Sequence, residues 1–132
     1  MKILLADDHP LTLQGTKNFV ESLGYNVIDI CTNGVSALNS IKLHSPDVAI
    51  LDINMPGLDG LDVAKKVFEN KLKTKIILLT MHKEMTIYNK AKEYNIYGYI
   101  LKLKLRRKFS YAKKFKPVIF ISISIMAFSL KS

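Results

Sequence analysis

The chain has 132 residues, of which 48% are hydrophobic and 23% charged, and this composition predicts one globular domain with a real core. The single cysteine, Cys31, excludes an intramolecular disulfide, and the chain opens on a strand pattern and not on a signal peptide, so we expect a cytoplasmic protein. Residues 1–101 are neutral in sum, so the net charge of +9 belongs to residues 102–132 and does not mark the whole chain as a nucleic-acid binder.

Five short apolar runs predict β-strands in the first hundred residues. In chain order they are Ile3–Ala6, Val27–Ile30, Val48–Leu51, Ile76–Leu79 and Tyr97–Leu101. The second run is followed by Cys31-Thr32, which adds no obvious chemistry and suits a strand at the edge of the sheet.

The segments between these runs carry apolar residues at helical spacing. They predict a helix over Leu11–Leu23, one from Asn33-Gly34 to Ser45-Pro46, one marked by Leu61, Ala64, Val67 and Phe68, and one marked by Met85, Tyr88 and Ala91. Strands that alternate with helices and lack alternating polarity are buried on both faces. We therefore expect an α/β fold with a parallel sheet and helices on each side.

Polar residues follow four of the five predicted strands. They are Asp7 and Asp8 after the first, Asp52 after the third, Thr80 after the fourth and Lys102 after the fifth. In open parallel sheets, ligands bind beyond the carboxyl ends of the strands. Three carboxylates gathered there repel one another unless a cation or a shared proton lies among them. The sequence therefore predicts a functional site at this edge.

Each of these residues also has a purely structural explanation. Asp8 is placed to cap a helix that begins near Pro10, and Thr80 can serve as another helix cap. Lys102 can be an ordinary solvated charge, and residues 52–57 contain the Asn, Pro and Gly that favour turns. The coincidence of all five polar residues at strand ends favours the functional interpretation.

Four segments together resemble the receiver domain of bacterial two-component response regulators. They are Asp7-Asp8, Asp52–Gly60, Leu79-Thr80 and Gly98–Lys102. The resemblance spans residues 1–102 and implies a flavodoxin-like, three-layer fold whose five-stranded parallel sheet has the order 2-1-3-4-5. The sequence motifs Asp7-Asp8-His9-Pro10 and Gly98–Lys102 further resemble those of the LuxR/NarL-type subfamily, whose output is a helix-turn-helix DNA-binding domain.

The resemblance implies a signalling switch and not an enzyme. Asp52 would accept a phosphoryl group from a sensor histidine kinase or a phosphotransfer protein. Asp7, Asp8, Asp52 and the backbone carbonyl of Asn54 would hold Mg²⁺.

The resemblance also assigns three residues to the phosphorylated state. The ammonium of Lys102 and the hydroxyl of Thr80 would contact phosphate oxygens. Inward movement of Thr80 would make room for the ring of Tyr99 and so change a partner-binding surface. We expect DNA contact only through an output domain, which residues 1–132 do not contain, and a homodimer is one expected assembly.

After residue 102 the resemblance stops. Residues 103–116 allow a fifth helix, and residues 117–132 form an atypical tail in which the longest apolar stretch is too short to span a bilayer. Three explanations of the tail are open: it is a frameshift product, a basic and apolar anchor, or the end of a single-domain receiver without a function of its own. Its abrupt change in charge and composition favours the frameshift.

A phosphatase-like enzyme that also forms an aspartyl phosphate is the alternative function. Enzymes of that class have a D-x-D-x-T pattern after the first strand, which disagrees with the spacing of Asp7, Asp8 and Thr12 here. Three histidines lie in different segments and lack the spacing of metal ligands: His9, His44 and His82. We expect solvated or capping roles for them.

Overall fold

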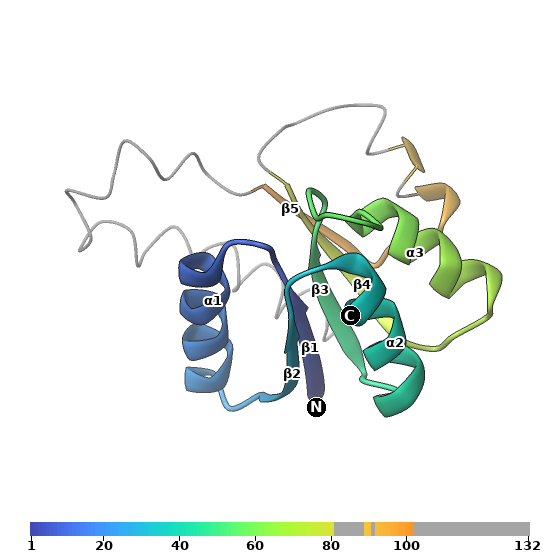
Figure 1. Ribbon diagram of the computed structural model, residues 1–132. Coiled ribbons are helices and arrows are strands. Elements are labelled where there is room, and N and C mark those ends of the chain that lie inside the picture. Colours follow the sequence, from blue (N-terminus) through green and yellow to red (C-terminus); the bar gives the residue numbers. More distant parts are fainter. Residues whose placement is uncertain (81–88, 91, 102–132) are drawn as a thin grey trace.

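Five parallel strands form one sheet in the order β2-β1-β3-β4-β5 (Figure 1). The computed structural model of the protein describes residues 1–80, 89–90 and 92–101. The strands are β1 (Lys2–Ala6), β2 (Asn26–Cys31), β3 (Val48–Asp52), β4 (Lys75–Thr80) and β5 (Gly98–Leu101). Each predicted run therefore forms a strand, with ends that differ by one residue at most. The predicted fold class and strand order are confirmed.

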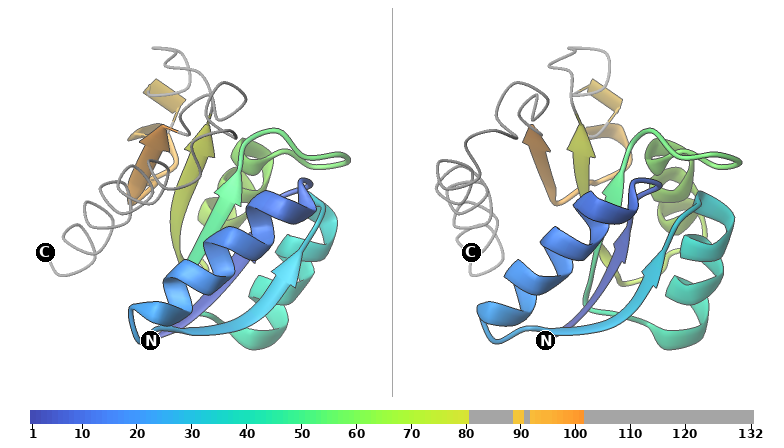
Figure 2. Two further views of the ribbon diagram at one scale, coloured as in Figure 1. Left: turned by 90° about the vertical axis from the view of Figure 1, so that its left-hand side faces the viewer. Right: turned by 60° about the vertical axis from the view of Figure 1, so that its left-hand side comes forward.

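Helices cover both faces of the sheet, which gives three layers (Figures 1 and 2). Helix α1 (Pro10–Ser22) packs on one face, and α2 (Gly34–His44) and α3 (Gly60–Glu69) pack side by side on the other. The fourth predicted helix, with its markers Met85, Tyr88 and Ala91, lies outside the described residues. So do the predicted fifth helix over 103–116 and the tail over 117–132.

Two of the three inner strands, β1 and β3, supply much of the core. Alternate residues of β1 point to opposite layers, so Ile3 and Leu5 pack with α1 while Leu4 and Ala6 pack with α2 and α3. These side chains are at most 1% exposed. Full burial of a leucine or isoleucine contributes about 1.5–3 kcal/mol. The centre of the sheet therefore gives rigid support to the loops that follow β1 and β3.

The edge strand and the helix surfaces are less buried than the central strands. Strand β2 is half-buried along most of its length, as expected for an edge, and its Ile30 is 42% exposed. Phe68, which marked the third predicted helix, is 50% exposed, as is Val35 in the first turn of α2. No helix within the described residues is long and apolar enough to cross a membrane.

Helix starts place the loops that follow β1 and β3. His9, and not Asp8, is the residue before α1, and no side chain caps that helix, so the capping explanation of Asp8 is wrong. Pro10 begins α1, a position where its missing N–H is not needed. At α3, Asp59 accepts the N–H of Asp62 while the carboxylate of Asp62 accepts the N–H of Asp59.

Candidate functional site

The pairing of β1 with β3 brings two aspartates to the same edge of the sheet. Ala6 pairs with Leu51, so Asp7 and Asp52 come next in the two chains. The backbone fixes both positions, because the N–H of Asp7 donates to the carbonyl of Cys31 at 3.0 Å and Asp52 pairs with Leu79 of β4. The arrowheads of these strands point to this edge in Figure 2.

The structure gathers the three predicted aspartates into one cluster. One carboxylate oxygen each from Asp7, Asp8 and Asp52, together with a ring nitrogen of His9, lie within 4.8 Å of one another. The side chains of Asp7 and Asp52 are 3% exposed, and that of Asp8 is 35% exposed. Two carboxylates are thus buried side by side, and one flank of the cluster is open to solvent.

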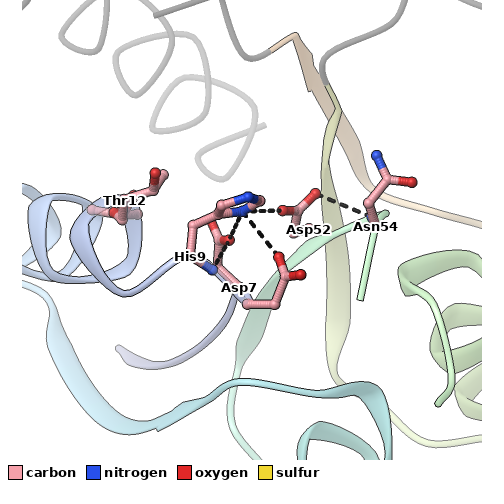
Figure 3. Close-up of polar contacts among 7 residues, drawn as sticks. Asp7, His9, Thr12, Asp52 and Asn54 are labelled. Atoms are coloured by element: carbon pink, nitrogen blue, oxygen red, sulfur yellow. Dashed lines mark hydrogen bonds and ion pairs between the residues drawn. The ribbon is translucent and has the colours of Figure 1, made fainter. Parts of the chain in front are cut away.

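His9 is the member of this cluster that the sequence did not indicate. Its Nδ1 atom lies 3.2 Å from Oδ1 of Asp7, 3.0 Å from Oδ1 of Asp8 and 3.9 Å from Oδ2 of Asp52 (Figure 3). The side chain is 67% exposed, so the prediction of a solvated histidine holds for much of its surface. The prediction missed the direction of the ring, and the only sequence signal was adjacency to Asp7-Asp8.

The loop after β3 is held close to the cluster. The backbone N–H of Asn54 donates to Oδ1 of Asp52 at 3.2 Å, as Figure 3 shows. The N–H of Gly60 closes the loop on the carbonyl of Ile53 at 2.9 Å. Gly34 at the start of α2 lies under this loop, and a Cβ there would come within 1.9 Å of the carbonyl oxygen of Leu58. The loop that contains Asn54 is therefore clamped at both ends.

The remaining predicted residues are described only in part. Thr80 is the last residue of β4 and its backbone pairs with Leu101, so it ends at the same sheet edge as Asp52. Tyr99 lies in β5 opposite Leu78. Lys102 lies outside the described residues.

The cluster fits a hard divalent cation. Carboxylate oxygens are the ligands that Mg²⁺ prefers, and it usually retains several waters. Two buried carboxylates at ligand spacing repel each other without a positive charge between them. The exposed flank at Asp8 and His9 leaves room for water or an incoming phosphoryl group. The residues present thus suit Mg²⁺ bound among the three carboxylates, with Asp8 on the side that faces solvent.

Comparisons with known proteins agree with this geometry. The family described as "Response regulator receiver domain" matches residues 3–110. The "Probable transcriptional regulatory protein NarL" of Mycobacterium tuberculosis is 38% identical over 103 residues, which cover 77% of this chain and 48% of that protein. The chain therefore spans about half the length of this relative.

Two solved structures share the fold. A DNA-binding response regulator of the LuxR family from Staphylococcus aureus has a TM-score of 0.73 and 29% identity, with 76% of this chain and 84% of that chain covered. The isolated REC domain of RcsB from Salmonella enterica serovar Typhimurium, in the presence of the phosphomimetic BeF3−, has a TM-score of 0.71 and 29% identity, with 77% of each chain covered. The resemblance to the LuxR/NarL-type subfamily is confirmed, and the chain belongs to the receiver-domain family of two-component response regulators.

Proposed function

We propose that this chain is a phosphoacceptor switch in which Asp52 receives a phosphoryl group from a sensor histidine kinase or a phosphotransfer protein. The observation that carries the proposal is the cluster of Asp7, Asp8 and Asp52, whose oxygens lie within 4.8 Å at the carboxyl edge of a receiver fold. The RcsB receiver, a structural relative, is described with a phosphomimetic, which supports the same chemistry here.

The family resemblance assigns the role of nucleophile to Asp52 among the three aspartates. Its Oδ1 accepts the N–H of Asn54, which orients the carboxylate, and its Oδ2 faces His9 on the exposed flank. An oxygen of Asp52 attacks the phosphorus of a phosphohistidine, the new O–P bond forms as the P–N bond breaks, and the electron pair returns to the imidazole nitrogen of the kinase. The product is an acyl phosphate.

Asp7 and Asp8 provide the oxygen ligands beside this nucleophile. Together with Asp52 and the backbone carbonyl of Asn54 they would hold Mg²⁺, which when bound neutralises charge on the phosphoryl oxygens. Asp7 is itself held in place, because its Oδ1 accepts the backbone N–H of His9 at 2.9 Å. A ligand fixed in this way does not have to be reoriented when the phosphoryl group arrives.

The response to phosphorylation is assigned to the ends of β4 and β5. The hydroxyl of Thr80 and the ammonium of Lys102 would contact phosphate oxygens, and the ring of Tyr99 would follow Thr80 inward. Support comes from the family and from the backbone pairing of Thr80 with Leu101 at the same edge as Asp52. DNA contact through an output domain, a homodimer and a cytoplasmic location remain predictions.

The experiment is intact-mass measurement after incubation with acetyl phosphate, with and without Mg²⁺. We expect a gain of one phosphoryl group that requires Mg²⁺ and is absent in Asp52→Asn. Asp47→Asn is the matched control, because Asp47 lies just before β3 at the opposite edge of the sheet and its acceptor oxygen is retained. A label that persists in Asp52→Asn would overturn the assignment.

Two further measurements separate the alternatives. Repeated release of phosphate from small phosphate monoesters, beyond one equivalent, would support the phosphatase-like enzyme instead of the switch.

For residues 103–132, the encoding DNA can be translated in the other two frames after codon 102. A fifth helix and a helix-turn-helix sequence found there would establish the frameshift.

A further inference from the structure

We propose that His9 is a nitrogen ligand of the cation bound by the three aspartates, and that it adds affinity for Co²⁺, Mn²⁺ or Zn²⁺ that Mg²⁺ does not gain. The inference rests on the proposed metal site and deepens it, because it assigns a fourth side chain and a class of cation. The observation behind it is the direction of one imidazole nitrogen.

The distances around Nδ1 of His9 match those between ligands of one ion. Nδ1 lies 3.0, 3.2 and 3.9 Å from oxygens of Asp8, Asp7 and Asp52. Metal–ligand bonds of about 2.1 Å in an octahedral site place adjacent ligand atoms about 3 Å apart and opposite ones about 4.2 Å apart. The distances to Asp8 and Asp7 equal the spacing of adjacent ligands, and the one to Asp7 is also a hydrogen bond, while the distance to Asp52 lies between the two spacings. Nδ1 therefore faces the position that an ion among the carboxylates would take.

The fold turns the imidazole toward the aspartates and not toward the helix that follows it. His9 stands at the residue before α1, yet its side chain makes no capping hydrogen bond there. Its backbone is fixed by the N–H bond to Asp7 on one side and by Pro10 on the other. The side chain is 67% exposed, so the far side of the imidazole is open to solvent.

A nitrogen donor changes which cations the site prefers. Mg²⁺ favours oxygen ligands and gains little from an imidazole, whereas first-row transition ions bind nitrogen well and follow a rising order of affinity from Mn²⁺ to Cu²⁺. Three carboxylates already supply negative charge in excess of a divalent ion. A neutral fourth ligand therefore adds a bond without adding repulsion.

The rival explanation is that His9 is a protonated counter-ion that holds the carboxylates together only until a metal replaces it. The two explanations predict opposite effects of removing the ring. A counter-ion competes with every cation, so its loss raises the affinity for Mg²⁺ and Co²⁺ by the same factor. A ligand contributes to Co²⁺ binding alone, so its loss lowers the affinity for Co²⁺ and leaves that for Mg²⁺ nearly unchanged.

The test compares Co²⁺ and Mg²⁺ binding to the full chain, to His9→Ala and to His44→Ala by calorimetric titration. His44 is exposed at the far end of α2, near Lys2, and serves as the matched histidine control. We expect His9→Ala to lose about tenfold or more in Co²⁺ affinity, because loss of a partner that merely orients a ligand already costs about tenfold or more. We expect His44→Ala to behave as the wild-type chain.

Proton NMR of the Co²⁺-bound chain gives a direct signature of the ligand. A bound imidazole shows hyperfine-shifted resonances of its carbon-bound ring protons, which we expect in the wild type and in His44→Ala and not in His9→Ala. An equal change in Co²⁺ and Mg²⁺ affinity, or persistence of the resonances in His9→Ala, overturns the role of His9 and leaves the three-aspartate site intact. Failure of the wild-type chain to bind either ion overturns the metal site itself.

Discussion

Gly60 lies against the backbone of Asp52 so closely that a Cβ atom on Gly60 would come within 2.6 Å of the carbonyl oxygen of Asp52. Real Cβ atoms essentially never come so close to another heavy atom. The first residue of α3 thus packs directly behind the proposed nucleophile. The start of that helix and the position of Asp52 are coupled through the backbone, and this coupling can be tested by adding one methyl group.

Gly60→Ala is expected to destabilise the protein by about 1–3 kcal/mol, because α3 or the end of β3 must shift to admit the methyl group. The same shift is expected to slow phosphorylation of Asp52 by acetyl phosphate. Urea unfolding measures the first effect and intact mass over time measures the second.

The control for this substitution is Gly15→Ala. Gly15 lies inside α1 on an exposed surface, with nothing within 4 Å of the added Cβ. Alanine there is expected to stabilise the protein by about 1 kcal/mol, since glycine is the poorer helix former. Equal effects of the two substitutions would contradict the close approach at Gly60.

Binding of Mg²⁺ is expected to stabilise the wild-type fold. At about a hundred times the dissociation constant, a ligand that binds only the folded state adds roughly 2.7 kcal/mol. Asp7→Asn should lose most of this gain because it removes a charged ligand. In the presence of a chelator the same variant should be at least as stable as the wild type, since it reduces repulsion among the carboxylates. Urea unfolding with Mg²⁺ or with chelator distinguishes these cases.

The start of α3 gives a prediction about charge and capping. Asp59→Ala removes the acceptor for the N–H of Asp62 and is expected to cost about 1 kcal/mol. Asp59→Asn keeps an acceptor and should leave stability unchanged or slightly higher, because burial raises the pKa of Asp59 and so disfavours its charged form. Thermal unfolding of both variants makes the comparison, and equal losses would argue against the capping role.

Cys31 gives the protein a dependence of stability on alkaline pH. Burial, with a smaller contribution from the negative charge of Asp29, raises the pKa of the Cys31 thiol from 9.0 to about 11. Between these two values the folded chain keeps a proton that the unfolded chain has lost, so stability falls as the pH rises. Cys31 as a whole residue is 6% exposed, so its thiol should react slowly with alkylating reagents in the folded state.

Cys31→Ala isolates this effect from the titration of lysines and tyrosines. Near pH 11 the free energy of unfolding of the wild type should have fallen by roughly 1–3 kcal/mol more than that of the variant, relative to values measured below pH 9. Parallel curves for the two proteins would show that the thiol does not contribute.

The strands and the acidic cluster could be predicted because both depend on chain order. Buried parallel strands leave continuous apolar runs, and any aspartate directly after such a run comes to the carboxyl edge, as Asp7 and Asp52 do. The direction of the His9 ring could not be predicted. It depends on the path of a loop between Asp7 and Pro10, which leaves no periodic signal in the sequence.

Other parts of the structure escaped prediction for a similar reason. Val35 and Phe68 have the spacing of core residues, but each is half exposed. The close backbone approaches at Gly34 and Gly60 were not predicted, because the need for a missing side chain arises only when α2 and α3 meet the loop after β3.

The alignment of β1 with β3 limits how the gene for this protein can change. Because Ala6 pairs with Leu51, Asp7 and Asp52 each lie one residue beyond this pair. Loss of a single codon within either strand would draw its aspartate back by about 3.3 Å and exchange the layers that its apolar side chains meet. Helices and surface turns can lengthen or shorten across descendants, whereas these two segments must keep their length.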